Sequence, residues 1–218
     1  MIRAVIFDMD GTLLDTERIY AAAWRAAGEE LQFAQTEEAL AACTGRNLTD
    51  IRRYFEEHYA GVMSFDLLQT TRERYYEHAI ASGGVPLKPG ATALLAYLKS
   101  NGIKIALATS TGPERTRYNL SSTGLLPYFD VLVTGEDVTH GKPHPETFLT
   151  AAARLGVAPQ ACMGVEDSFN GVRAIRAAGM VTVMVPDTVS PTDEIRALLD
   201  AECQTLAEIQ PVIEKYNQ

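Results

Sequence analysis

Apolar residues along the chain fall into two alternating kinds of segment. Short apolar runs rich in β-branched residues occur at residues 3–7, 103–109, 130–134, 161–165 and 181–185. Between them lie stretches of helical periodicity that end at a glycine, at residues 91–102, 113–124, 145–156 and 170–179. Strands that alternate with helices of this length predict crossover connections and a mostly parallel sheet.

The alternation fails in one segment close to the N-terminus. Residues 16–85 show no strand pattern, and their amphipathic helical stretches fall at residues 17–31, 49–59 and 64–80. The following stretch, SGGVPLKPG, carries three glycines and two prolines, which is typical of a linker. We therefore predict an α/β protein with a doubly wound parallel sheet, formed by residues 1–15 and 87–218, and an inserted all-helical domain at residues 16–86.

Composition narrows the class of partner. The chain has 218 residues, of which 46% are hydrophobic and 22% charged, as in an ordinary globular protein. Its net charge of −9 argues against nucleic acid or an anionic membrane as a partner, and a small anionic substrate would need a local positive site.

The cysteines and the apolar runs bear on the compartment. Cys43, Cys162 and Cys203 are far apart and lack metal-site spacing, so we expect reduced thiols. No apolar run reaches the length of a signal-peptide core or a membrane span, so we expect a cytoplasmic protein. The sequence does not fix the oligomeric state, and a monomer is compatible with it.

Polar residues follow the predicted strands. A doubly wound sheet binds its ligands beyond the carboxyl ends of its strands, which is where these residues are expected. In chain order these residues are Asp8 and Asp10, Thr109 and Ser110, Lys142, and Glu166 and Asp167. Carboxylates that converge at low dielectric need a compensating cation or proton. An all-oxygen set without histidine or cysteine favours Mg²⁺ as the cofactor.

The spacing of the first two aspartates suggests a reaction. Asp8 and Asp10 face the same side if the strand geometry continues, so one can attack phosphorus while the other transfers the proton. Gly11 allows a sharp turn with free backbone N–H groups, and Lys142 and Thr109 would bind the transferring phosphoryl group. Each motif alone fits an ordinary loop, strand end or helix start, whereas all four in this order favour a catalytic site.

The segments DMDGT, LATST, GKPHPETF and GVEDSFNG resemble, in order and spacing, the four motifs of the haloacid dehalogenase superfamily. The similarity covers nearly the whole chain and points to the branch with a helical cap inserted after the first motif. It implies that Asp8 is the nucleophile and that Asp10 is the general acid and base, whose backbone carbonyl also binds Mg²⁺. It further implies that Lys142 and Thr109 orient the phosphate, with Lys142 also steadying the Asp8 carboxylate.

The resemblance also assigns the remaining metal ligands and narrows the activity. Asp167 resembles the further ligand, and Glu166 a direct or water-mediated one. Dehalogenases of the superfamily lack the second aspartate. This chain has it as Asp10, so dehalogenation is not expected. Phosphonatases use a cap lysine, and residues 16–86 contain none. We therefore expect a Mg²⁺-dependent phosphatase of a small phosphorylated metabolite, with a sugar phosphate as the favoured class.

Two other functions stay open. A phosphosugar mutase resembling β-phosphoglucomutase would have a histidine where this chain has Tyr20 and would also use a cap lysine, so both absences favour hydrolysis. A retired enzyme that only binds phosphometabolites would be expected to have lost Asp8, Asp10 or Lys142, and all three are present.

Substrate choice is expected to depend on the insert. Arg46, in the loop CTGRNLTD, and Glu17 are candidate substrate contacts, together with Ser110 from the core. Tyr20 fits helix packing better than substrate binding. His58 and His78 have no metal-binding spacing, and His140 and His144, which flank the lysine motif, are expected in a loop and at a helix start.

Overall fold

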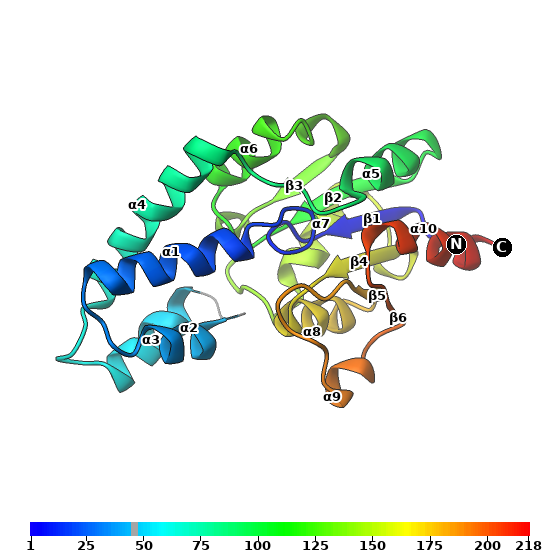
Figure 1. Ribbon diagram of the computed structural model, residues 1–218. Helices are drawn as coiled ribbons and strands as arrows, with labels where there is room; N and C mark the ends of the chain where they lie inside the picture. Colours follow the sequence, from blue (N-terminus) through cyan, green and yellow to red (C-terminus); the bar gives the residue numbers. More distant parts are fainter. Residues whose placement is uncertain (45–47) are drawn as a thin grey trace. The chain divides into compact units, whose positions relative to one another are not determined.

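Parallel strands form one sheet in the order β3-β2-β1-β4-β5-β6 in the computed structural model, which describes residues 1–44 and 48–218 (Figure 1). The strands are β1 (Ala4–Phe7), β2 (Lys104–Ala108), β3 (Val131–Val133), β4 (Cys162–Glu166), β5 (Val181–Met184) and β6 (Ala201–Glu202). The first five are those that the apolar runs predict. The prediction of an α/β fold with a parallel sheet is confirmed.

The central position of β1 explains its uninterrupted apolar sequence. All four residues are buried, because β1 lies between β2 and β4 in the middle of the sheet and helices cover both faces. Phe7 is in register with Leu107 and with Val165. The residues that follow these three strands therefore emerge at the same edge of the sheet.

Helices cover both faces of the sheet. Those that connect the strands are α5 (Ala91–Ser100), α6 (Pro113–Ser122), α7 (Glu146–Leu155) and α8 (Phe169–Ala177). α7 and α8 pack on one face, where Phe148 and Ile175 join Ala4 and Ile6 in a buried cluster. α5 contacts β2, and right-handed crossovers put α5 and α6 on the opposite face (Figure 1).

The C-terminal segment adds α9 (Asp193–Arg196) and α10 (Ile209–Asn217), of which α10 packs beside α5. The described residues also form short 3₁₀ helices, labelled η1 (Leu126–Tyr128), η2 (Gly135–Asp137), η3 (Pro159–Ala161) and η4 (Leu206–Glu208). β6 was not predicted, because two residues carry no readable periodicity.

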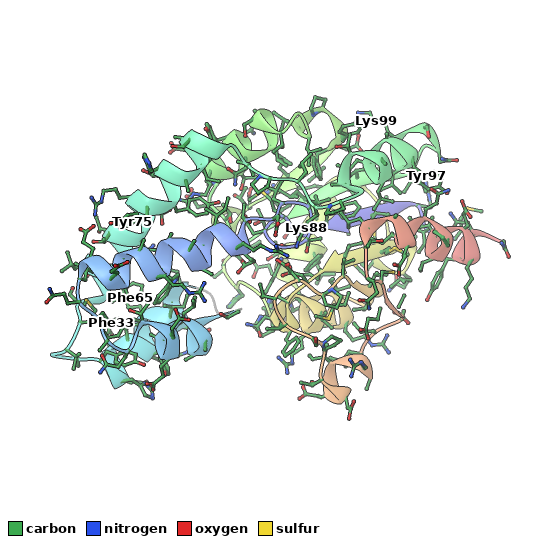
Figure 2. All side chains as sticks on the ribbon, viewed as in Figure 1. Phe33, Phe65, Tyr75, Lys88, Tyr97 and Lys99 are labelled. Carbon is green, nitrogen blue, oxygen red and sulfur yellow. The ribbon has the colours of Figure 1, made fainter. Side chains whose placement is uncertain are left out.

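The chain divides into two units, one made of Met1–Asp15 and Pro86–Gln218 and the other of Thr16–Val85. Pro86 thus belongs to the first unit rather than to the insert. The second unit contains α1 (Glu17–Glu30), α2 (Thr36–Cys43), α3 (Leu48–His58) and α4 (Phe65–Gly83). Its core is rich in aromatic residues, among them Phe33 and Phe65, which Figure 2 labels.

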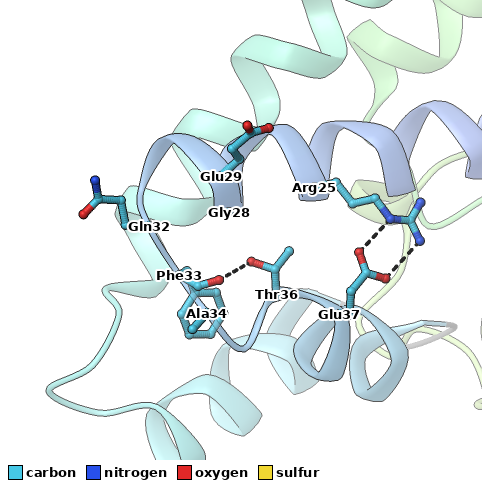
Figure 3. A pocket seen from close by; sticks show the side chains of 8 residues that line it. All are labelled: Arg25, Gly28, Glu29, Gln32, Phe33, Ala34, Thr36 and Glu37. Atoms are coloured by element: carbon cyan, nitrogen blue, oxygen red, sulfur yellow. Dashed lines mark hydrogen bonds and ion pairs between the residues drawn. The ribbon is translucent and has the colours of Figure 1, made fainter.

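α1 and α2 approach each other closely within the second unit. A Cβ on Gly28 would lie 1.9 Å from Oγ1 of Thr36, so only glycine fits there. Arg25 and Glu37 join the two helices through hydrogen bonds of 2.7 and 3.1 Å. A pocket of about 420 Å³ lies beside these contacts and is lined by residues of both helices and of the turn between them (Figure 3). None of the residues that line it is a predicted site residue.

Two further expectations concern thiols and membranes. Cys43, Cys162 and Cys203 are buried, and none of the three forms a disulfide. Among the described residues, no helix combines the length and the apolar content needed to cross a bilayer.

A charged capping arrangement follows β3. Asp137, at the end of η2, accepts hydrogen bonds from the backbone N–H and the hydroxyl of Thr134, at 2.8 and 2.7 Å. Arg154 of α7 donates to its other oxygen at 2.7 Å. The bonds from Thr134 and then that from Arg154 lower the pKa of Asp137 from 3.8 to about 2.

We predict that Asp137→Asn destabilises the protein at neutral pH. Because the pKa of the folded state is the lower one, the stabilisation is fully present above pH 3.8 and is lost as the pH falls towards 2. Allowing for solvent screening, the loss at pH 7 is about 1 kcal/mol. Melting temperatures of the two proteins should differ at pH 7 and converge between pH 4 and pH 2. A difference that stays constant with pH would contradict the charge as its source.

Candidate active site

Asp8 follows the central strand and is 7% exposed. Its N–H donates to the carbonyl of Val165 at 3.0 Å, so strand geometry continues one residue past β1. The chain then turns at Gly11, which has a φ of 81°. A Cβ at this position would lie 2.3 Å from Oδ2 of Asp167, so glycine is required both for the turn and for the close approach.

Lys142 joins the ends of β1 and β4. Its ammonium donates to Oδ1 of Asp8 at 2.5 Å and to Oε1 of Glu166 at 2.6 Å. All three side chains are at least nine-tenths buried. Lys142 lies in the loop between η2 and α7, 134 residues from Asp8 in the sequence.

Glu166 is held on both oxygens. While Oε1 accepts from Lys142, Oε2 accepts from the backbone N–H of Asp167, and from the N–H and the hydroxyl of Ser168, at 2.8 to 3.0 Å. Ser168 also accepts the N–H of Gly171 at 3.1 Å and so caps α8. A Cβ on Gly171 would lie 1.8 Å from the Glu166 carboxyl carbon, so glycine makes room for this carboxylate.

Asp167 completes a group of carboxylates. It is 7% exposed, and the hydroxyl of Thr12 donates to its Oδ1 at 3.0 Å. One oxygen each of Asp8, Glu166 and Asp167 lies within 4.8 Å of the others. This buried, all-oxygen group fits a hard divalent cation, because Mg²⁺ prefers such donors.

Asp10 has a partner that the sequence did not reveal. The hydroxyl of Thr111 donates to its Oδ2 at 2.7 Å, across 101 residues of sequence. Thr109 is buried, and its hydroxyl accepts the N–H of Thr111 at 3.1 Å. The three residues after β2 thus form a turn that directs one hydroxyl at Asp10. No local pattern marks Thr111, because its role depends on the pairing of β2 with β1.

The electrostatics follow from burial. Burial raises the pKa of Asp8 well above its usual value, Lys142 lowers it, and Glu166 and Asp10 raise it again. Burial would lower the pKa of Lys142, but Asp8 and Glu166 raise it above its ordinary value. The ammonium therefore keeps its proton, and it balances one negative charge of a group with three carboxyl groups. Ionisation of the whole group calls for further positive charge.

The chain leaves the first unit after Asp15 and re-enters it at Pro86, next to the loop that follows β1. The N–H of Asp15 donates to the carbonyl of Pro86 at 2.9 Å, and Lys88 N–H donates to Leu13 at 2.9 Å. The Lys88 ammonium, labelled in Figure 2, donates to Asp187 at 2.5 Å and to Asp15 at 3.3 Å. These bonds fix the two linker segments side by side.

The remaining predicted contacts belong to different segments of the chain. Ser110 is exposed after β2, and Glu17 begins α1 in the second unit. Arg46 lies outside the described residues. Tyr20 packs within the second unit, edge-on to Tyr76 with ring centroids 5.9 Å apart, as expected for a packing residue.

Known proteins resemble most of the chain. The haloacid dehalogenase-like hydrolase family matches residues 2–179. A probable pseudouridine-5′-phosphatase of Drosophila melanogaster is 37% identical over 84% of this chain and 80% of its own. A phosphorylated carbohydrates phosphatase of Thermotoga maritima is 33% identical over 97% of both chains.

Solved structures give the same result. A putative β-phosphoglucomutase from Thermotoga maritima has a TM-score of 0.79 and 30% identity, and the match covers 98% of this chain and 99% of that one. CbbY from Rhodobacter sphaeroides, in complex with phosphate, has a TM-score of 0.79 and 26% identity over 96% of both chains. From the extent of the family match and of these relatives, we conclude that the chain belongs to the haloacid dehalogenase-like hydrolase family.

Proposed function

We propose that the protein is a Mg²⁺-dependent phosphatase that hydrolyses a small phosphorylated metabolite, with sugar phosphates as the favoured class. One observation carries this proposal. Asp8 follows the central strand with one oxygen held by the Lys142 ammonium, and Asp10 lies two residues further on with its own hydroxyl donor. A fixed carboxylate beside a second carboxyl group suits nucleophilic attack with proton transfer.

The proposed reaction has two steps. The Asp8 carboxylate attacks phosphorus, the bond to the leaving oxygen breaks, and Asp10 donates its proton to that oxygen. Asp10 then takes a proton from water, whose oxygen attacks the phosphorus of the aspartyl-phosphate. Inorganic phosphate leaves and the Asp8 carboxylate is restored. Lys142 and Thr109 would bind the phosphoryl oxygens as negative charge builds on them.

The carboxylate group would hold the cofactor. Asp8 and Asp167 would supply side-chain oxygens and Asp10 its backbone carbonyl. Glu166, whose orientation four hydrogen bonds from protein donors fix, would contribute directly or through a bound water. Bound Mg²⁺ would offset the charge of the carboxylates and of the phosphate.

Several names among the similar proteins support the substrate class. They include a phosphatase of phosphorylated carbohydrates and a hexitol phosphatase, each 33% identical to this chain. We propose that the unit Thr16–Val85 acts as the cap that selects the leaving group, with Glu17 and Arg46 as candidate contacts and Ser110 as a contact from the core. A lid of this kind would also exclude water from the reaction.

A mutase is the second candidate, because two similar structures carry the name β-phosphoglucomutase, at 30% and 29% identity. Tyr20 and the lysine-free insert favour hydrolysis, since a mutase must hold and reorient a bisphosphate. Conversion of β-glucose 1-phosphate to glucose 6-phosphate with a bisphosphate activator, faster than phosphate release, would replace the phosphatase proposal with this one.

The first test replaces the proposed nucleophile. Phosphate release from a panel of phosphorylated sugars, polyols and nucleosides should require Mg²⁺. Asp8→Asn should reduce that release by at least about a thousandfold, because an amide does not form the covalent intermediate.

The control for this test is the exposed Asp193→Asn, which should keep the parent rate. Circular dichroism should show that both variants are folded. Release that persists in folded Asp8→Asn, or that proceeds equally without Mg²⁺, would disprove the mechanism.

A second test concerns Thr111 as the residue that positions Asp10. Thr111→Val removes the hydroxyl at constant shape and should slow hydrolysis of a sugar phosphate about tenfold, with Thr111→Ser restoring it. p-Nitrophenyl phosphate should be affected less, because its leaving group needs no proton. An equal loss with both substrates would show that Thr111 does not act through Asp10.

A further inference from the structure

A second group of metal-ligating side chains lies at the surface of the first unit. His140, His144 and Glu146 each offer an atom within 4.8 Å of the other two. The histidines stand in the loop before α7, two residues either side of Lys142, and Glu146 is the first residue of α7. The side chains of His140 and His144 are 63% and 52% exposed, so an ion can reach them from solvent.

The contacts in this group centre on one carboxylate oxygen. Nδ1 of His140 lies 2.8 Å from Oε2 of Glu146, and Nδ1 of His144 lies 3.8 Å from the same oxygen. The two imidazole rings are 4.7 Å apart between centroids and tilted by 40°. Nδ1 of His144 also accepts the backbone N–H of Glu146 at 3.3 Å, and an ion bound at this nitrogen would replace that hydrogen bond.

The carboxylate is fixed before any ion arrives. The backbone N–H of Thr139 donates to Oε1 of Glu146 at 2.8 Å, and that of His140 donates to Oε2 at 3.0 Å. These bonds orient the carboxylate in the way that outer hydrogen bonds commonly orient metal ligands. The nearby Lys142 ammonium does not compete, because it is buried against Asp8 and Glu166.

We propose that His140, His144 and Glu146 form a second metal site, which takes Zn²⁺ or another borderline transition ion and completes its coordination with water. The two ring nitrogens and one carboxylate are donors that such ions favour, whereas the all-oxygen group around Asp8 favours Mg²⁺. The ion replaces the hydrogen that lies between Nδ1 of His140 and Oε2 of Glu146. The site is independent of the proposed phosphatase activity.

Calorimetric titration with Ni²⁺ tests this site on the reduced protein of 218 residues, in excess Mg²⁺ that would occupy the carboxylate group around Asp8. The double variant His140→Ala/His144→Ala is compared with His58→Ala/His78→Ala, which removes the two other exposed histidines. The parent and the His58/His78 variant should each bind one equivalent, and the His140/His144 variant should bind about tenfold more weakly or not at all. Equal Ni²⁺ binding by all three proteins would overturn the proposal.

A single variant separates the loss of a ligand from the loss of loop structure. His144→Ala leaves the contact between His140 and Glu146 in place, and unchanged melting temperature without Ni²⁺ would show that the fold is intact. The proposal requires weaker Ni²⁺ binding by this variant, and unaltered affinity would contradict it. Bound Co²⁺ should show no thiolate charge-transfer absorption, and such a band would assign the ion to a cysteine instead.

Discussion

The ammonium of Lys142, shared between the carboxylates of Asp8 and Glu166, is the interaction around which the candidate site is organised. Removing three charged groups from water costs several kcal/mol per group, and their mutual attraction offsets that cost only when the geometry is good. The geometry comes from the sheet, because the pairing of β1 with β4 brings Asp8 and Glu166 to one edge. The fold therefore holds these three charged groups in place, and the group itself adds little to the net stability of the protein.

Space for this arrangement comes from two glycines. Gly11 lets the first loop pass close to Asp167, and Gly171 leaves room for the Glu166 carboxylate at the start of α8. Ser168 then uses its hydroxyl twice, as a donor to Glu166 and as the cap of α8. The position of the buried carboxylates and the start of the helix are therefore fixed by the same few residues.

The sequence predicts the sheet well because its strands are short, apolar and separated by helices of regular length. It predicts the family because the four motifs DMDGT, LATST, GKPHPETF and GVEDSFNG occur in the order and spacing of that family. It does not predict α2, whose eight residues show too few turns for a clear periodicity. Nor does it predict the bonds from Thr111 to Asp10 and from Lys142 to Glu166, because these contacts depend on how distant segments pair. The roles of Asp8, Asp10, Thr109 and Lys142 in catalysis stay predictions.

The group of Asp8, Glu166 and Asp167 calls for a hard cation in addition to Lys142, because one ammonium does not balance three carboxylates. Calorimetric titration of Mg²⁺ into the parent protein and into Asp167→Asn tests this most directly, because the substitution removes one negative charge at nearly constant shape. The parent should bind one Mg²⁺, and the affinity of the variant should be at least about tenfold lower. Equal Mg²⁺ affinity in the two proteins, or no Mg²⁺ binding by the parent, would contradict it.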